Sequence, residues 1–276
     1  MMFIELGIII IISLIAQLII NFQYYMIGAI LLLIFEIFIQ IQKFYHPIVI
    51  SIDGNIGSGK STLMKILKNN FKDYVFVDEP VNKWLSAKDD NNKNLLTNFY
   101  EDTNRWSYTF QNYAFITRTK NLMDAVTNIK AQNITEYIKI FFNRIFFGKK
   151  LVIFTERSIL TDRYVFAEML HDSKNINSME WTMYLDWYKV FKNSINIDNI
   201  VYLKTDPTKS LERVNKRARN EEKSVDLEYL KLVHDKHEKW LSNNSKSIII
   251  DGNQEFESDN TKILNIINQI KSKLQI

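Results

Sequence analysis

The sequence predicts an α/β fold in which helices cover both faces of a doubly wound parallel sheet of about five strands. Five short apolar runs are separated by longer helix-like segments, and they lie at residues 48–52, 74–78, 151–155, 199–204 and 247–250. Short apolar strands that alternate with helices are typical of a parallel sheet buried on both faces. A glycine-rich turn directly after the first run supports the same fold class.

Helix signals occupy the segments between these runs. Residues 62–69 follow the glycine-rich turn, and residues 104–129 form a long segment with an aromatic-rich face. After the fourth run, Asp206 precedes Pro207, and proline is favoured at the first position of a helix. The alternation of strand and helix therefore continues towards the C-terminus.

The N-terminal segment differs in composition from the rest of the chain. Its clear charges are Glu5, Glu36 and Lys43, whereas the remainder has the mixed pattern of a globular domain. We therefore predict a hydrophobic membrane-anchor segment at residues 1–46 and a globular domain at residues 47–276.

Two apolar runs within that segment, at residues 6–20 and 26–41, are separated by residues 21–25. Each run is near the lower limit for crossing a bilayer, and its aromatic neighbours suit the membrane interface. We predict a two-helix membrane hairpin, with a single anchor as the alternative. Glu36 and Gln40 favour a third interpretation, a helical hairpin buried in the globular domain, because charges within a span are costly.

The same segment sets the expected location of the protein. An excess of basic residues beside a membrane span favours the cytoplasmic side, so the globular domain of a membrane-associated chain would face the cytoplasm. A soluble cytoplasmic protein is the alternative.

Composition limits the expected partners. The formal charge of +4 comes from 35 basic and 31 acidic residues, and the chain has no dense basic block with interleaved aromatic residues. We therefore expect no nucleic-acid partner. The chain has no cysteine, which excludes disulfides and the usual thiolate metal sites.

The glycine-rich turn matches the P-loop pattern G-x-x-x-x-G-K-S in its required context of strand, loop and helix. Glycines let backbone N–H groups close around phosphate oxygens, and the following helix adds the positive end of its dipole. The predicted fold is therefore of the P-loop NTPase type. The residues expected around the phosphates of a nucleoside triphosphate are Gly54, Asn55, Ile56, Gly57, Ser58, Gly59, Lys60, Ser61 and Thr62.

Two of these side chains have distinct expected roles. Lys60 would reach the outer phosphates, and the Ser61 hydroxyl would hold Mg²⁺. A glycine-rich turn with a chance lysine is the alternative. A P-loop alone does not identify a reaction, because many unrelated activities use the same fold.

Several further groups of polar and aromatic residues stand at the ends of the predicted strands or on the helices. Ligands of open α/β sheets bind at the carboxyl ends of strands, so these groups are candidates for a shared site. They are Asp78-Glu79-Pro80-Val81 with Trp84, Phe110-Gln111, Glu156-Arg157-Ser158, Asp162-Arg163-Tyr164, and Arg213, Arg217 and Arg219 with Glu221 and Glu222.

Taken together, over residues 49–256, these residues resemble the deoxynucleoside kinase family, which includes deoxycytidine, deoxyguanosine and mitochondrial thymidine kinases. The resemblance implies transfer of the ATP γ-phosphoryl group to the 5′-hydroxyl of a deoxynucleoside, with Mg²⁺ as cofactor, in nucleotide salvage. It also implies a homodimer. The hydrophobic N-terminus departs from the familiar soluble members, and Asp53 stands where glutamate is more usual.

The resemblance assigns roles in phosphoryl transfer. Glu79 corresponds to the general base for the 5′-hydroxyl, Arg157 lies beside it and the transferring group, and Glu156 helps Ser61 to hold Mg²⁺. A lid of three arginines, Arg213, Arg217 and Arg219, closes on the phosphates. Glu79 could instead be a surface glutamate, and Arg157 and Glu156 a structural ion pair. The three arginines could instead form a solvated helix face.

The resemblance also assigns the substrate contacts. Tyr100 and Glu222 match the pair that binds the sugar 3′-hydroxyl, and Gln111 would pair with the base. Trp84, Phe110 and Phe166 would form the hydrophobic walls, although isolated aromatic residues on helices are usually core residues. Glu255 and Phe256 belong to a looser match with the loop that contacts the donor base.

Base preference depends on Arg118 and Asp162, a pair that in the resembled family marks the deoxycytidine and purine kinases. An Asp held by an Arg can accept a hydrogen bond from an exocyclic amino group, which thymine lacks. We therefore expect deoxycytidine, deoxyadenosine or deoxyguanosine to be preferred over thymidine. A salt bridge that leaves specificity broad is the alternative.

Two other functions remain open from the sequence. A deoxynucleoside monophosphate kinase of the thymidylate type also uses a P-loop, an Asp-Arg-Tyr element and an arginine lid, but Glu79 would repel a substrate phosphate. A membrane-tethered nucleotide-binding protein without turnover belongs to another class, and the presence of all the catalytic residue types disfavours it.

Overall fold

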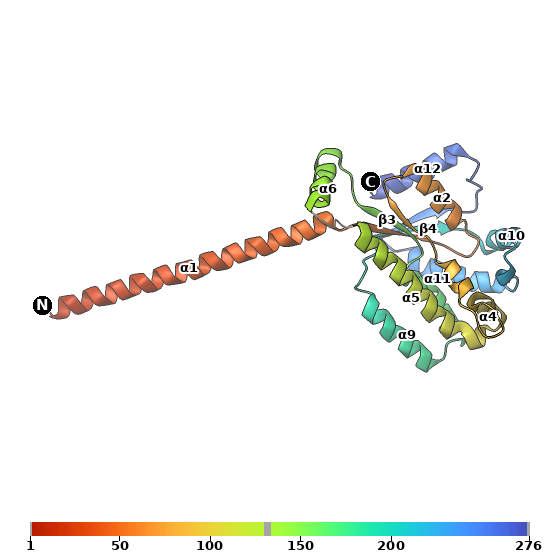
Figure 1. Ribbon diagram of the computed structural model, residues 1–276, viewed down its shortest axis with the longest axis horizontal. Helices are drawn as coiled ribbons and strands as arrows, with labels where there is room; N and C mark the ends of the chain where they lie inside the picture. The colour runs from red at the N-terminus through yellow and green to blue at the C-terminus, as the bar shows by residue number, and fades with distance from the viewer. Residues whose placement is uncertain (1, 130–133, 275–276) are drawn as a thin grey trace. The chain divides into compact units, whose positions relative to one another are not determined.

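The computed structural model describes residues 2–129 and 134–274 and contains one five-stranded sheet in which all strands are parallel (Figure 1). The spatial order is β2-β3-β1-β4-β5, so the central strand is the first in the sequence. The strands are β1 (Ile48–Asp53), β2 (Val75–Val77), β3 (Val152–Glu156), β4 (Asn199–Lys204) and β5 (Ser247–Asp251). The predicted α/β fold with five parallel strands is confirmed.

Helices pack on both faces of this sheet. The buried residues of β1 alternate, because Ile50 and Ile52 join the core formed with α2 and α12, whereas Val49 joins the core on the opposite face, with Leu122 of α5 and Leu241 of α11. The helices named here are α2 (Lys60–Asn70), α5 (Thr103–Ile129), α11 (Leu227–Leu241) and α12 (Asn260–Leu274). Burial on both faces explains the continuous apolar sequence of β1.

The remaining elements surround the carboxyl ends of the strands or lie on the surface. They are α3 (Val81–Ser86), α4 (Leu95–Glu101), α6 (Ile134–Phe147), α7 (Ile159–Thr161), a π-helical segment (Asp162–Ala167), α8 (Glu168–Asp172), α9 (Ser178–Phe191), α10 (Pro207–Arg217) and a 3₁₀ turn (Asn220–Glu222). The expected start of α10 is confirmed, since Asp206 is its N-cap and Pro207 its first residue.

The chain separates into two units, Met1–His46 and Pro47–Ile276. The first unit consists of α1 (Met2–Tyr45), one continuous helix, so the predicted two-helix hairpin is wrong. The reason lies in residues 21–25, Asn-Phe-Gln-Tyr-Tyr, which contain neither glycine nor proline and therefore do not end a helix.

The membrane prediction has no support either. Within residues 2–129 and 134–274, no helix has both the length and the apolar character that crossing a membrane requires. The alternative of a buried helical hairpin is also wrong, because residues Met2–Tyr45 form one continuous helix.

Candidate active site

The P-loop connects β1 to α2 and depends on backbone conformations that favour glycine. Gly57 has a φ of +75° and Gly59 a φ of +99°, in the region that other residues rarely adopt. A Cβ at Gly57 would also lie 2.4 Å from the carbonyl oxygen of Ser210 in α10. The loop therefore packs closely against α10 and delivers the N-terminus of α2 to the site.

Lys60, the first residue of α2, folds back onto the P-loop. Its Nζ donates to the carbonyl oxygen of Asn55 over 2.7 Å, and the Asn55 side chain donates to the carbonyl oxygen of Leu230 over 2.8 Å. Burial, together with repulsion from Arg157, lowers the pKa of Lys60 to about 7. A nearby phosphate would stabilise the charged ammonium form of Lys60.

A cavity of about 690 Å³ opens between the P-loop, the carboxyl ends of the strands and the surrounding helices. All of the site residues predicted from the sequence line it except Gly54, Asn55 and Ser58. Those three residues support the loop through their carbonyl oxygens, which accept hydrogen bonds from the side chains of Arg157, Lys60 and Arg213, respectively. The structure therefore brings the separate sequence motifs together.

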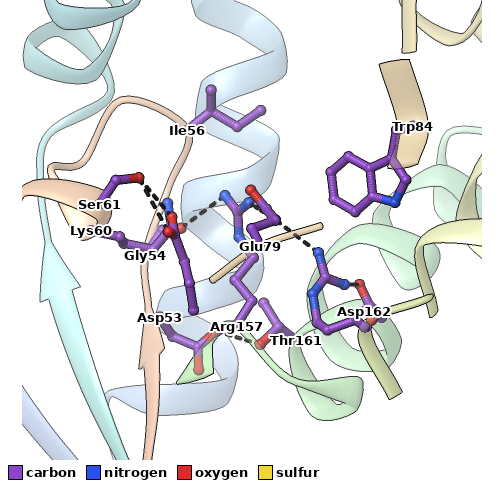
Figure 2. Close-up of polar contacts among 12 residues, drawn as sticks. Asp53, Gly54, Ile56, Lys60, Ser61, Glu79, Trp84, Arg157, Thr161 and Asp162 are labelled. Carbon is purple, nitrogen blue, oxygen red and sulfur yellow. Dashed lines mark hydrogen bonds and ion pairs between the residues drawn. The ribbon is translucent and has the colours of Figure 1, made fainter. Parts of the chain in front are cut away.

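A carboxylate at the end of β2 forms the centre of a charged network in this cavity (Figure 2). Glu79 Oε1 accepts from Arg157 Nη1 over 2.7 Å and from Arg118 Nη2 over 2.8 Å, while Arg118 Nη1 bonds to Asp162 Oδ1. Burial opposes ionisation of Glu79, but Arg157, Arg118 and Lys60 outweigh it and lower its pKa to about 2. Glu79 is therefore ionised at neutral pH.

Arg157 reaches this network from a strained backbone position at the end of β3. Its φ of +60° is unusual for a residue with a side chain. The conformation is held by the Arg157 N–H, which donates to the Ile52 carbonyl over 3.0 Å, and by the Thr155 hydroxyl, which donates to the Arg157 carbonyl over 3.0 Å. The guanidinium carbon also lies 4.8 Å from the centre of the Phe166 ring.

Ser61 and Glu156 form an oxygen-rich corner beside the P-loop. The Ser61 hydroxyl lies 3.0 and 3.2 Å from the two carboxylate oxygens of Glu156. Burial and repulsion from Glu79 raise the pKa of Glu156. Hydroxyl and carboxylate oxygens suit Mg²⁺, which commonly takes one or two carboxylates and completes its shell with water and substrate phosphates. Among the described residues, no group of three or more His, Cys, Asp and Glu side chains is placed to hold a metal ion. A Mg²⁺ shell completed by water and phosphate oxygens does not need such a group.

Two residues that line the opposite end of the cavity carry buried acceptor atoms. Gln111 Oε1 on α5 and Asp162 Oδ2 on the π-helical segment have no hydrogen-bond partner among the described residues. Buried polar atoms are nearly always paired, so both atoms are candidates for binding a ligand. Burial raises the pKa of Asp162, and the Arg118 guanidinium opposes that rise.

Aromatic side chains enclose the same end of the cavity. Trp84 meets Phe110 edge to face at 5.3 Å, and Phe110 stacks on Phe99 at 4.5 Å. Tyr100 is half-buried beside Tyr229, with ring centres 6.4 Å apart, and loss of solvent around the phenol and the nearby Tyr229 raise its pKa. This wall is apolar and flat enough to accept a planar ring.

The three predicted lid arginines line the cavity in two groups. Arg217 and Arg219 both pair with Glu222, with a distance of 2.9 Å from Arg219 Nη1 to Glu222 Oε1. Arg213 instead donates to the Gly252 carbonyl over 2.8 Å. The arginines are therefore held beside the P-loop by partners within the protein.

Some lining residues escaped the sequence analysis. Phe99 and Tyr229 form part of the aromatic wall, and Lys216 adds a fourth basic residue at the end of α10. Lys216 could have been found from its place between Arg213 and Arg217. Phe99 and Tyr229 carried no local signal, because core aromatic residues occupy the same kind of helical position.

Fold and site together define a class of protein. A P-loop beside a parallel sheet, an ionised carboxylate held by two arginines, and an enclosed pocket opposite the loop define a P-loop phosphotransferase that acts on a small molecule.

Comparison with known proteins gives the family within this class. A family model described as deoxynucleoside kinase matches residues 50–275. Deoxycytidine kinase 2 of Gallus gallus is 38% identical over 252 residues, covering 82% of this chain and 89% of the relative. Deoxycytidine kinase of Homo sapiens is 39% identical over 208 residues, covering 70% and 74%, and mitochondrial deoxyguanosine kinase of Xenopus laevis is 35% identical over 215 residues, covering 72% and 75%.

The chain belongs to the deoxynucleoside kinase family. It is an ATP-dependent deoxynucleoside kinase and acts in nucleotide salvage.

Proposed function

We propose that this kinase prefers deoxynucleosides whose base carries an exocyclic amino group, namely deoxycytidine, deoxyadenosine and deoxyguanosine, over thymidine. The observation that carries the proposal is the pair of buried acceptors without partners, Gln111 Oε1 and Asp162 Oδ2. An amino group can donate to both, whereas the O4 carbonyl of thymine would face them with a third acceptor. The relatives named as deoxycytidine and deoxyguanosine kinases support this preference.

Arg118 fixes which oxygen of Asp162 is available to the base. It bonds to Oδ1, so Oδ2 remains for the substrate. The Arg118 side chain is also buried against Trp84, with 5.5 Å from its guanidinium carbon to the ring centre. The burial of the pair supports a rigid acceptor over a salt bridge that leaves specificity broad.

The sugar is expected to lie between the base pocket and Glu79. In this placement, Tyr100 and Glu222 bind the 3′-hydroxyl, since Glu222 is buried, Tyr100 is half-buried, and the two line the cavity close to each other. A buried contact of this kind leaves little room for a 2′-hydroxyl and favours deoxyribose over ribose.

Phosphoryl transfer follows from the charges around Glu79. Both arginines contact Oε1, and among the described residues no hydrogen bond is assigned to Oε2, which is free to accept the proton of the 5′-hydroxyl. As the 5′-oxygen bonds to the γ-phosphorus, that proton passes to Glu79 and the bond to the ADP oxygen breaks. Arg157 and Lys60 stabilise the negative charge on the transferring group.

The donor is expected at the P-loop, with its phosphates over the N-terminus of α2 and its base towards Glu255 and Phe256. Ser61 and Glu156 would hold Mg²⁺, which when bound neutralises phosphate charge. Arg213, Arg217 and Arg219 would close over the phosphates, exchanging their protein partners for phosphate oxygens.

A homodimer fits an exposed apolar face on α9 and α5, two helices that pack side by side (Figure 1). Side chains at helical spacing expose apolar surface that a monomer would leave in water. Size measurement by light scattering tests this, and substitution of Trp187 by Glu is expected to give monomers. The residues of this face are Met179, Met183, Trp187, Val190, Ile116 and Met123.

A monophosphate kinase is the enzymatic alternative, and the charge of Glu79 disfavours it. An ionised carboxylate beside the oxygen that attacks the γ-phosphorus would repel a phosphate group on the substrate. A binding protein without turnover is disfavoured because the carboxylate, both arginines and the P-loop lysine all reach one cavity.

The experiment that tests the proposal offers Mg-ATP to the full chain with an equimolar mixture of the four deoxynucleosides and, separately, with their monophosphates. We expect the monophosphates of deoxycytidine, deoxyadenosine or deoxyguanosine to form first. Product from the deoxynucleoside monophosphates alone would favour the alternative kinase, and thymidine as the fastest substrate would refute the base preference.

A further inference from the structure

We infer that Thr117 is a positioning residue, which orients the Trp84 wall of the nucleoside pocket without touching the substrate. The inference rests on the proposed placement of the nucleoside against Trp84. Thr117 lies on α5 and does not line the cavity, whereas Trp84 on α3 does. No motif in the sequence marks this threonine.

The contact between the two side chains has a defined direction. The Trp84 indole Nε1–H donates to Thr117 Oγ1 over 3.0 Å. The Thr117 hydroxyl in turn donates to the carbonyl oxygen of Tyr113 over 2.7 Å, so its lone pairs are available to the indole. Among the described residues, Thr117 Oγ1 is the sole acceptor assigned to the Trp84 N–H.

Burial makes this hydrogen bond important. Trp84 is 4% exposed and Thr117 is 7% exposed. If the Thr117 hydroxyl were removed, water could not readily replace it as the acceptor for the indole N–H. An indole N–H buried without an acceptor is unfavourable, and the ring would tilt or move to find one.

The orientation of the indole ring matters to its neighbours. Trp84 packs edge to face on Phe110 at 5.3 Å with an interplanar angle of 79°. The Arg118 guanidinium carbon also lies 5.5 Å from the ring centre, and Arg118 directly follows Thr117 in α5. A tilt of the ring would therefore disturb both the apolar wall and the arginine that holds Asp162.

Valine at position 117 isolates the role of the hydroxyl, because it keeps the shape of threonine and removes the acceptor. We expect Thr117→Val to raise the KM for deoxycytidine about tenfold, while kcat and the KM for ATP change less than about twofold. Thr117→Ser restores the acceptor and should keep the KM for deoxycytidine near that of the wild type.

Thr119→Val is the matched control. Thr119 lies on the same helix, is 2% exposed, and its hydroxyl also donates to the carbonyl four residues earlier, that of Phe115, over 2.7 Å. It has no hydrogen bond to Trp84. This control measures the cost of burying valine in α5, so an equal rise in KM for both variants would overturn the inference.

A double-mutant cycle with Trp84→Phe supplies a measurement that a merely structural role would not affect. Phenylalanine has no N–H, so Thr117→Val should change the KM for deoxycytidine less than about twofold in that background. A tenfold rise that persists without the indole would refute the coupling. Thr117→Ala provides the same comparison if Thr117→Val does not fold by circular dichroism.

The cycle also separates the inference from the nucleoside placement. If Trp84→Phe and Trp84→Ala both leave the KM for deoxycytidine unchanged, the nucleoside does not lie against Trp84, and placement and inference both fail. If Trp84→Ala raises the KM but Thr117→Val does not, the placement stands and the inference alone is wrong.

Discussion

Arg118 donates from Nη2 to Oε1 of Glu79 over 2.8 Å. The other terminal nitrogen of the same guanidinium bonds to Asp162, so one side chain joins the proposed base-recognition carboxylate to the proposed catalytic carboxylate. The correct base can therefore affect the position of Glu79 through a single rigid group. Asp162 and Arg118 are buried and the Glu79 side chain is 13% exposed, which keeps these interactions strong because water screens them little.

Glu79→Gln is predicted to abolish most phosphoryl transfer and to leave ATP binding largely intact. The amide keeps the size of the side chain but cannot accept the 5′-hydroxyl proton, and loss of a general base typically lowers kcat by about 10²- to 10⁴-fold. Steady-state kinetics and ATP titration measure the two effects. Glu101→Gln, at an exposed carboxylate paired with Lys93, is the control. Unchanged turnover in Glu79→Gln would contradict the assignment of the base.

Asp162→Asn is predicted to weaken discrimination between amino and carbonyl bases. The new amide can present an N–H where Asp162 Oδ2 now lies, and that N–H can donate to O4 of thymine. We expect the ratio of kcat/KM for deoxycytidine to that for thymidine to fall at least about tenfold, which corresponds to about 1.4 kcal/mol. A ratio equal to that of the wild type would show that Asp162 is structural.

ATP binding is predicted to take up a proton at pH 8. Burial and Arg157 lower the pKa of Lys60 to about 7, so at pH 8 most free protein has this amine uncharged. A bound triphosphate favours the charged amine and raises its pKa, so that close to one proton, about 0.9 at most, is taken up. Calorimetry in buffers of different ionisation enthalpy measures this uptake.

The same titration at pH 6 serves as the control. Lys60 is already charged in most of the free protein at that pH, so little proton uptake by this amine is expected. Absence of uptake at pH 8 would mean that the lysine is charged before the nucleotide arrives.

His237 is predicted to make the fold sensitive to acid. It is fully buried, and its Nδ1 lies 2.8 Å from the Val233 carbonyl oxygen, while its Nε2 has no partner among the described residues. Burial lowers the pKa of His237 from 6.5 to about 3. Below pH 6.5 the imidazole of the unfolded chain is protonated, whereas that of the folded chain stays neutral until about pH 3. The free energy of unfolding therefore falls as the pH drops from 6.5 to 3.

The size of this effect follows from the pKa difference. Between pH 7 and pH 5, the His237 imidazole should lower the free energy of unfolding by about 2 kcal/mol. His237→Phe removes the titrating group, and its free energy of unfolding should fall less than that of the wild type over the same range, as measured by urea denaturation. An equal fall in both proteins would contradict the prediction.

Much of the fold could be predicted because its signals are local. The five apolar runs became five strands, and no strand end differs from its prediction by more than one residue. The edge strand β2 is shorter than its apolar run, because it pairs with β3 alone and over three residues. The P-loop needed its glycines at fixed spacing, so its position could be read directly from the sequence.

Other features depend on the folded structure. The N-terminal hairpin was wrong because polar residues between two apolar runs do not interrupt a helix unless its backbone is broken. The positive φ of Arg157 and the link from Thr117 to Trp84 carry no sequence pattern, since both arise when distant segments pack together. The π-helical segment likewise has no sequence pattern that predicts it, and it carries both Asp162 and Phe166, which line the same cavity.

The most direct test of the account compares deoxycytidine with deoxyuridine in the wild-type chain. The two bases differ along one edge, where the C4 amino group and N3 acceptor of cytosine become the O4 carbonyl and N3–H of uracil. Both lack the thymine methyl, so the comparison tests the contact of this edge to Gln111 and Asp162. We predict a kcat/KM at least about 100-fold higher for deoxycytidine, because an uncompensated pair of buried acceptors disfavours the uracil O4. Equal kcat/KM values for the two would contradict the central claim that these two acceptors read the base.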